Sequence, residues 1–253
     1  MKATLRDGEG VEVSVVFPAY NEKDHLEDAV KKTMKVLDGI TESYEIIIAE
    51  DGSTDGTDRI AARLSAEHAV VRHIHSDKRL GRGLALRRAF AKSNGRILIY
   101  MDVDLATGVG HLETLIKSVR KDCDFATGSR MLRESKATRS RSRQIASKSY
   151  NFMVRTLLGS NVSDHQCGFK SWRRKALLEL LDDVNATHWF WDTEMLVRAS
   201  RRGYSIKEIP IEWTHKGRTK VNLVKDSLTM GSQVVRLWWE LRKQSCTKNY
   251  LGI

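Results

Sequence analysis

The sequence predicts an α/β fold, with a mostly parallel central sheet and helices on both of its faces. In the first half of the chain, continuous apolar runs alternate with segments of helical character. Such runs are typical of parallel strands that are buried on both faces. The unusual polar clusters of this half directly follow the apolar runs, at the strand ends where open parallel sheets bind ligands.

The elements of the first half alternate regularly. A β-branched run opens the series, which favours a strand, and the wholly apolar run 97–101 closes it. The predicted elements are, in order, strand 11–17, helix 22–37, strand 44–49, helix 55–64, strand 69–74, helix 83–93 and strand 96–101.

The second half is less regular. Only two prolines occur and no Gly/Ser-rich linker interrupts the chain, so we expect one large domain, residues 1–221. Residues 222–253 are expected to add a C-terminal amphipathic helix. Its Trp238–Trp239 pair, flanked by basic residues, suits a membrane interface, or could pack on the domain. The predicted elements are strand 124–127, helix 140–158, strand 206–211 and helix 222–243.

The composition restricts the partners. The 253 residues are 41% hydrophobic, enough for a sizeable core, and the net charge of +11 favours anionic partners such as nucleotide phosphates, nucleic acid or an acidic membrane surface. The three cysteines show no metal-type spacing, which favours a reduced compartment. The polar N-terminus predicts no signal peptide, and no stretch approaches the roughly 20 apolar residues that span a bilayer.

Two carboxylates, Asp102 and Asp104, flank Val103 at the end of the apolar run 97–101. Carboxylates in this position favour a hard divalent cation, Mg²⁺ or Mn²⁺, and the usual role of such an ion is to neutralise phosphate. An Asp-x-Asp pattern is weak alone, because surface loops contain many. Its position after a buried strand makes it informative.

Two further polar clusters follow predicted strands. Residues 18–22 read Pro-Ala-Tyr-Asn-Glu, and Asn21 could simply cap the next helix. Residues 50–57 contain Asp51, whose carboxylate we expect to face the crevice and accept hydrogen bonds from a nucleobase, although an ordinary turn would explain it as well.

Together these segments resemble the family 2 glycosyltransferases of the GT-A fold, which is Rossmann-like, over about residues 11–221. Residues 80–83, Leu-Gly-Arg-Gly, resemble the family's glycine-basic-glycine turn. The resemblance implies a nucleotide-diphosphate sugar donor and a metal held by Asp102 and Asp104, one of which could instead contact the ribose. The implied nucleotide-binding residues are Pro18, Tyr20, Asn21, Glu22, Asp51, Gly81, Arg82, Asp102, Val103, Arg218 and Lys220.

Within that family the chain is most similar to the dolichyl-phosphate mannose and dolichyl-phosphate glucose synthases. This similarity rests on four segments, residues 128–130 (Gly-Ser-Arg), 164–170, 189–194 and 216–221. It also rests on one helical face, which carries Arg143, Ser147 and Asn151 at intervals of four residues. The resemblance implies that the acceptor phosphate is held by Arg130, Arg143, Ser147 and Asn151. It also places Asp164, Gln166, Asp192 and Glu194 around the sugar.

The expected reaction is inverting transfer of a hexose from a nucleotide-diphosphate sugar, with UDP-glucose favoured, to dolichyl or polyprenyl phosphate. The product is a lipid-linked sugar donor for glycosylation. Transfer of mannose or N-acetylglucosamine stays open, as does a sugar hydroxyl as acceptor, with Asp164 or Asp192 as base. An ionised phosphate needs no such base. The expected catalytic residues are Asp104, Arg130, Arg143 and Ser147.

Two departures from the family pattern matter. Ala106 stands where some relatives have a further metal ligand, so we expect weak metal binding without nucleotide.

Many relatives carry transmembrane helices that this sequence does not carry. This predicts a peripheral protein at the cytoplasmic face, which contacts the membrane through residues 130–155 and 222–243. The basic region 130–155 could also bind nucleic acid, but no aromatic stacking platform accompanies it, so no nucleic-acid partner is expected.

Overall fold

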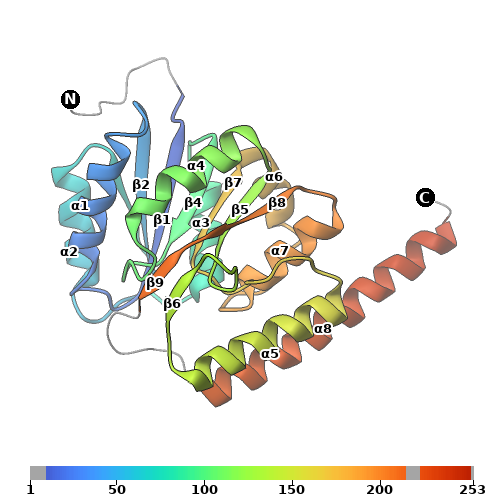
Figure 1. The fold of residues 1–253 in the computed structure, drawn as a ribbon. Helices are drawn as coiled ribbons and strands as arrows, with labels where there is room; N and C mark the ends of the chain where they lie inside the picture. The colour runs from blue at the N-terminus through green and yellow to red at the C-terminus, as the bar shows by residue number, and fades with distance from the viewer. Residues whose placement is uncertain (1–9, 215–222, 252–253) are drawn as a thin grey trace.

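A computed structural model describes residues 10–214 and 223–251, and in the last helix it describes the side chains of residues 229–243. Its main sheet has seven strands in the order β3-β2-β1-β4-β7-β5-β8. All neighbours are parallel except β7, which is antiparallel to both β4 and β5. The predicted α/β class is therefore confirmed (Figure 1). The strands are β1 (Val13–Ala19), β2 (Tyr44–Glu50), β3 (Val71–Ile74), β4 (Ile97–Met101), β5 (Phe125–Ser129), β7 (Phe169–Arg173) and β8 (Ile206–Pro210).

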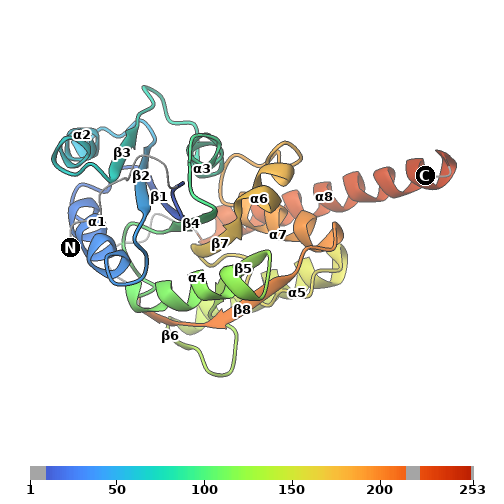
Figure 2. The ribbon, with the colours of Figure 1, turned by 90° about the horizontal axis from the view of Figure 1, so that it is seen from above.

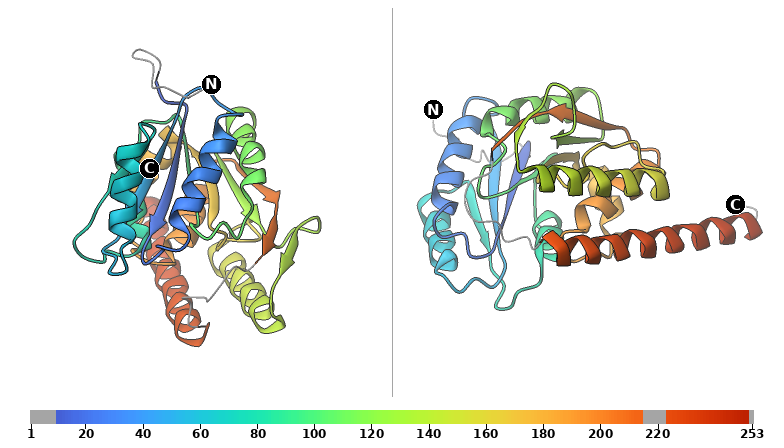
Figure 3. Two further views of the ribbon diagram at one scale, coloured as in Figure 1. Left: turned by 90° about the vertical axis from the view of Figure 1, so that its left-hand side faces the viewer. Right: turned by 60° about the horizontal axis from the view of Figure 1, so that its bottom comes forward.

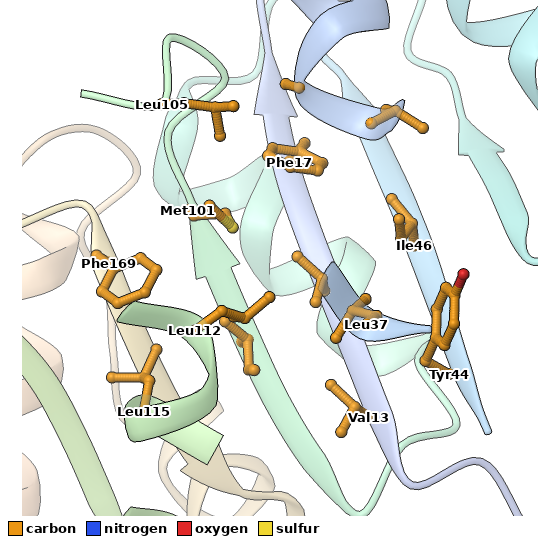
Figure 4. Close-up of a cluster of buried hydrophobic side chains, with 14 of the residues drawn as sticks. Val13, Phe17, Leu37, Tyr44, Ile46, Met101, Leu105, Leu112, Leu115 and Phe169 are labelled. Carbon is orange, nitrogen blue, oxygen red and sulfur yellow. The ribbon is translucent and has the colours of Figure 1, made fainter. Parts of the chain in front are cut away.

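Helices cover both faces of this sheet (Figure 2). One face packs against α1 (Leu26–Leu37), α2 (Thr57–Glu67) and α4 (Leu112–Lys121). Figure 4 shows the core beneath them, in which Phe17, Met101, Leu112 and Phe169 meet. The other face packs against α3 (Arg82–Ala91), α6 (Arg174–Leu181) and α7 (Trp191–Arg201). Burial on both faces explains why the strands read as continuous apolar runs.

Strand β7 was not predicted, because its sequence Phe-Lys-Ser-Trp-Arg does not read as a buried strand. Lys170 and Ser171 are nonetheless fully buried in the centre of the sheet. The Lys170 Nζ lies 3.0 Å from the Asp192 carboxylate, and the Ser171 hydroxyl donates to the Leu115 carbonyl at 3.3 Å. Partners distant in sequence therefore make this polar strand compatible with a core position.

A helical pair lies beside the sheet domain. Helices α5 (Arg141–Leu158) and α8 (Leu223–Leu251) run side by side, and α8 continues beyond the body of the molecule (Figures 1 and 3). The predicted C-terminal helix is confirmed and is longer than expected. No described helix is both long and apolar enough to cross a membrane. The buried apolar residues of α8 that pack on α5 and α7 are Met230, Val234, Leu237 and Leu241, and the partly buried Trp238 packs against the same cluster.

A small second sheet returns the chain toward the ends of the main strands. It pairs β6 (Lys136–Thr138) with β9 (Glu212–Thr214) in parallel, and Thr107 bridges to Trp213 beside it. A short 3-10 helix, η1 (Val109–His111), precedes α4. Strand β9 therefore lies between residues 136–138 and the segment that follows β4.

Candidate active site

The first two strand-end loops are tied together by hydrogen bonds. The Asn21 amide nitrogen donates to the Ser53 hydroxyl at 3.1 Å, and the Asn21 side chain accepts from the Thr54 amide at 2.9 Å. The Glu22 amide donates to the Thr57 hydroxyl at 2.8 Å. Asn21 adopts a left-handed conformation with φ of 53°, which asparagine tolerates better than most residues. Asn21 thus braces the loop after β2 and does not cap α1, whose N-cap is His25.

Asp51 was expected to face the crevice and accept hydrogen bonds from a nucleobase. The residue is 4% exposed, and its carboxylate already accepts two hydrogen bonds from the chain. One oxygen accepts from the Leu80 amide at 2.7 Å and the other from the Gly81 amide at 3.0 Å. Gly81 has φ of +97°, and a side chain there would collide with His188. The buried carboxylate therefore holds the 80–82 turn in place, because the turn supplies the donors that a buried charge requires.

The turn held by Asp51 presents Arg82 to the end of β4. The Arg82 guanidinium lies 2.5 Å from Asp102 and 3.9 Å from Asp192, above the rings of Tyr100 and Trp189. Burial opposes the Arg82 cation, but the neighbouring negative charge of Asp102 keeps its pKa well above the usual range. Arg82 is thus a permanent positive charge beside the predicted diphosphate position.

Asp104 lies half-buried two residues beyond Asp102. Its carboxylate accepts from the Ala106 amide at 2.9 Å, and the intervening Leu105 has φ of 48°. Burial and the negative charge of Asp102 raise the pKa of Asp104. A carboxylate that is held beside a second negative charge suits the binding of a divalent cation.

A further ligand for such a cation is absent from the side chains that the structure describes here. Ala106 is buried, and its carbonyl accepts from the Thr214 amide at 2.9 Å. The one cluster of three metal-ligating side chains in the described part of the chain, Glu50, His73 and His75, includes neither aspartate.

On the opposite side of the site, Arg130 is held by Asp164. The guanidinium donates to both Asp164 oxygens, at 2.6 and 2.8 Å, and the Arg130 amide donates at 3.0 Å. Burial would raise the pKa of Asp164, but the charge and hydrogen bonds of Arg130 hold it well below its usual range. Arg130 was predicted to hold the acceptor phosphate; the structure shows that a carboxylate already takes two of its donors.

Arg139 is the residue that the sequence analysis missed. One guanidinium nitrogen donates to the Ser147 hydroxyl at 3.3 Å, while Nε and the other terminal nitrogen are buried without a hydrogen-bond partner. Its guanidinium lies 5.1 Å from the centre of the Trp213 ring. Burial, and after it the positive charge of Arg130, lowers the pKa of Arg139 to about 10, and Arg143 contributes in the same direction. Arg139 is half-buried, and a guanidinium with two buried, unused donor nitrogens is typical of an anion site.

The predicted face of α5 divides into two roles. Arg143 lies close enough to Arg139 for their charges to interact, and Ser147 links Arg139 to the Gln166 side chain, 3.4 Å away. Asn151, however, uses its amide for structure. It donates to the Ser147 carbonyl at 2.9 Å and accepts from the backbone and ring of His165. Asn151 therefore fixes the 164–167 loop against α5.

The side chains that were predicted to surround the sugar make hydrogen bonds and ion pairs with other residues of the chain. Asp192 accepts from the Tyr100 hydroxyl and pairs with Lys170. Glu194 pairs with Arg198 at 2.7 Å and accepts from the Ala186 amide. Gln166 reaches from Ser147 toward Met230 of α8.

The remaining predicted nucleotide residues are placed as follows. Tyr20 lies under the Arg79 guanidinium at 4.0 Å, Pro18 is partly buried in β1, and Val103 is buried. Arg218 and Lys220 lie outside the described residues. The two ends of the site thus carry different charges, with paired carboxylates at β4 and clustered arginines beside α5.

This fold occurs in known glycosyltransferases. The structure superposes on glucosyl-3-phosphoglycerate synthase from Mycobacterium tuberculosis in complex with UDP, with a TM-score of 0.67 at 20% identity, over 91% of this chain and 79% of that chain. The same enzyme solved with Mn²⁺, UDP and glucosyl-3-phosphoglycerate gives a TM-score of 0.65 at 20% identity, over 89% of this chain and 77% of that chain. The predicted GT-A architecture is therefore confirmed.

The chain belongs to glycosyl transferase family 2, whose model matches residues 14–181. Glycosyltransferase AglD from Haloferax volcanii is 52% identical over 235 residues, which cover 92% of this chain but only 38% of that relative. A dolichyl-phosphate beta-glucosyltransferase from Drosophila melanogaster is 30% identical over 250 residues, or 93% of this chain and 77% of the relative. The predicted resemblance to this group is confirmed.

Proposed function

We propose that this chain transfers glucose from UDP-glucose to dolichyl or polyprenyl phosphate with inversion at the anomeric carbon. The similarity to dolichyl-phosphate beta-glucosyltransferases supports the sugar and the acceptor class. The observation that carries the proposal is the half-buried Arg139, which has two buried guanidinium nitrogens without a hydrogen-bond partner. A lipid phosphate supplies the anionic oxygens that those donors lack.

On the donor side, Arg82, Asp102 and Asp104 surround the proposed diphosphate position. Arg82 is pre-oriented by its ion pair with Asp102, so it stabilises negative charge without reorganising during the reaction. Asp102 and Asp104 would hold a divalent cation, Mg²⁺ or Mn²⁺, which neutralises the leaving diphosphate when it is bound. The hydrogen bonds between Asn21 and Ser53 and between Asp51 and Gly81 fix the surrounding loops relative to one another.

On the acceptor side, Arg139 and Arg143 with Ser147 hold the lipid phosphate. Arg130 is bound to Asp164, and the charges of this pair act on Arg139. A phosphate oxygen attacks the anomeric carbon while the bond from that carbon to the UDP oxygen breaks, and UDP leaves. Clustered arginines both bind the nucleophile and fix its direction of approach.

The contacts of the two carboxylates that could serve as a general base disfavour a sugar hydroxyl as acceptor. Asp164 is occupied by Arg130, which holds its pKa low, and Asp192 is buried between Tyr100 and Lys170. An ionised phosphate needs neither of them as a base. This agrees with a lipid phosphate as the acceptor.

A transfer assay tests the proposal. UDP-glucose, UDP-N-acetylglucosamine and GDP-mannose are each incubated with dolichyl phosphate and Mn²⁺, and lipid-linked sugar is measured. We expect UDP-glucose to be the best donor and Arg139→Ala to lower transfer by about 10²–10³-fold, the usual effect of losing an oriented donor. Arg63→Ala on α2, which also removes a guanidinium, is the matched control and should transfer normally. Full activity of Arg139→Ala would contradict the acceptor assignment.

The described surface also supports peripheral contact with a membrane at its cytoplasmic face. Helix α5 exposes Ile145 and Phe152, at 65% and 72%, on the same face as Arg141, Lys148 and Arg155. On α8, Val235 and Trp239 are exposed. Apolar side chains bordered by basic ones suit an anionic lipid surface. Such contact would bring the Arg139 cluster beside α5 close to a lipid-borne phosphate.

A further inference from the structure

A second cluster of metal-ligating side chains lies at the other end of the site, where β2 and β3 end. Glu50 is the last residue of β2, and His73 and His75 lie in and just after β3. Because Ile48 pairs with His73 in the parallel register, alternation places Glu50 and both histidines on one face of the sheet. A ligand atom of each residue lies within 4.8 Å of the other two.

The individual contacts favour a bound ion. The Glu50 side chain is fully buried and 2.5 Å from His75 Nδ1, and its other oxygen accepts from the Ser53 amide. His75 Nε2 lies 3.2 Å from the exposed Asp77 carboxylate. His73 Nε2 is buried and has no hydrogen-bond partner. A metal ion between these residues would give the unpaired His73 nitrogen a partner and would also neutralise the buried Glu50 carboxylate.

We propose that Glu50, His73 and His75 bind Zn²⁺ at a site separate from the donor metal site. Two imidazoles and one carboxylate suit zinc, whereas Mg²⁺ and Ca²⁺ prefer oxygen ligands alone. In that arrangement His75 binds the ion through Nδ1, replacing its bond to Glu50. Its Nε2–H then donates to Asp77, the outer-sphere carboxylate that orients zinc-bound histidines in many proteins.

The position of this site implies a structural role in the nucleotide pocket. Zinc would fasten the end of β3 to the end of β2, directly before Asp51. Asp51 holds the 80–82 turn, and that turn carries Arg82 to Asp102. The ion would therefore brace the loops on the donor side without touching the predicted donor metal ligands.

Zinc binding is measured on the folded chain without nucleotide, by competition with a chromophoric chelator and by thermal unfolding. We expect one zinc per chain and a Tm rise of roughly 5–10 °C at a hundredfold excess over Kd. Equal concentrations of Mg²⁺ or Ca²⁺ should not reproduce it. His75→Ala and Glu50→Gln should each weaken zinc binding by about tenfold or more, since even outer-sphere changes often cost that much.

Two controls separate this site from others. His111→Ala removes a histidine outside the cluster, and Asp104→Asn removes a predicted donor-metal ligand; both should keep the zinc affinity. If Glu50→Gln fails to fold, the half-exposed His75 decides the question. Zinc affinity unchanged in His75→Ala, or no zinc bound at all, would overturn the proposal and leave the glycosyltransferase assignment untouched.

Discussion

At the scale of single residues, the site is organised by charge pairs in which one member positions the other. Asp51 positions the 80–82 turn, and Asp164 positions Arg130. Each of these carboxylates is buried, so each must be fully paired. Asp104 and Arg139, by contrast, are incompletely paired, and in the proposed reaction they face the donor metal and the acceptor phosphate.

Asp104 provides the first test at this scale. Asp104→Asn keeps the side-chain shape and its acceptor for the Ala106 amide but removes the charge that a divalent cation requires. We expect a large loss of transfer, about 10²-fold or more, and a higher Mn²⁺ concentration for half-maximal activity. Asp28→Asn on the surface of α1 is the control. A variant that keeps full activity in the presence of a chelator would contradict a metal role for Asp104.

His165 predicts a dependence of stability on pH. The ring lies buried between Asn151 and Ser160, and burial lowers its pKa from 6.5 to about 3. Between these values the unfolded chain binds a proton that the folded chain does not. Stability contributed by neutral His165 is therefore complete above about pH 6.5 and falls as the pH drops toward 3, by up to about 1.4 kcal/mol per pH unit.

Urea denaturation of the wild type and of His165→Gln from pH 7 to 4 checks this effect. The wild-type free energy of unfolding should fall more steeply with decreasing pH than that of the variant. His111→Ala should retain the wild-type slope, because His111 lies at the surface end of η1 and is only partly buried. Parallel profiles for wild type and His165→Gln would show that the imidazole does not titrate as described.

At the scale of elements, α8 is joined to the domain by both apolar packing and charge. Leu237 is 3% exposed in a cluster with Val154 and Val197. Arg198 of α7 pairs with Glu194 at 2.7 Å and with Glu240 of α8 at 2.6 Å. The boundary predicted at residue 221 therefore separates two segments that pack on one another.

Leu237→Ala tests how far α8 is part of the folding unit. If the helix folds with the domain, the free energy of unfolding should fall by about 2–5 kcal/mol, the usual cost of a buried Leu→Ala change. Trp239→Ala, at an exposed position on the same helix, should change it little. A single transition in urea with a small loss for Leu237→Ala would contradict this packing.

At the scale of the whole molecule, exposed large hydrophobic side chains gather on the α5–α8 pair. Among the described side chains, Trp189 is the one such residue outside these two helices. Sedimentation with vesicles that contain anionic phospholipid measures their role. Phe152→Ser should weaken binding by about ten- to a hundredfold, the value of one buried aromatic side chain. Lys148→Ser should weaken it most at low salt, because screening reduces charge attraction.

Lys32→Ser on α1 is the matched control for the loss of a lysine and should bind vesicles as the wild type does. Binding that is equal for neutral and anionic vesicles, or unaffected by Phe152→Ser, would contradict the proposed membrane face. The experiment is independent of sugar transfer, so it separates docking from catalysis.

Much of the fold was predictable because the first half obeys local rules. Seven predicted elements there match β1 to β4 and α1 to α3 within a few residues at each end. Helix α7 was missed because its polar residues Asp192, Thr193, Glu194 and Arg198 are buried together with its apolar ones, so polarity does not mark its exposed face. Strand β7 was missed because its lysine and serine find partners only in the folded core.

The sequence by itself determined the alternation of strands and helices, the family, and the placement of Asp102 and Asp104 at a strand end, since these depend on neighbours along the chain. Only the tertiary structure decided which charged groups are free. Asp51 and Asp164 meet their partners across 29 and 34 residues, while Arg139 lies half-buried beside Ser147 with two donors unused. Whether a charge is paired depends on contacts between distant segments, and these exist only once the chain has folded.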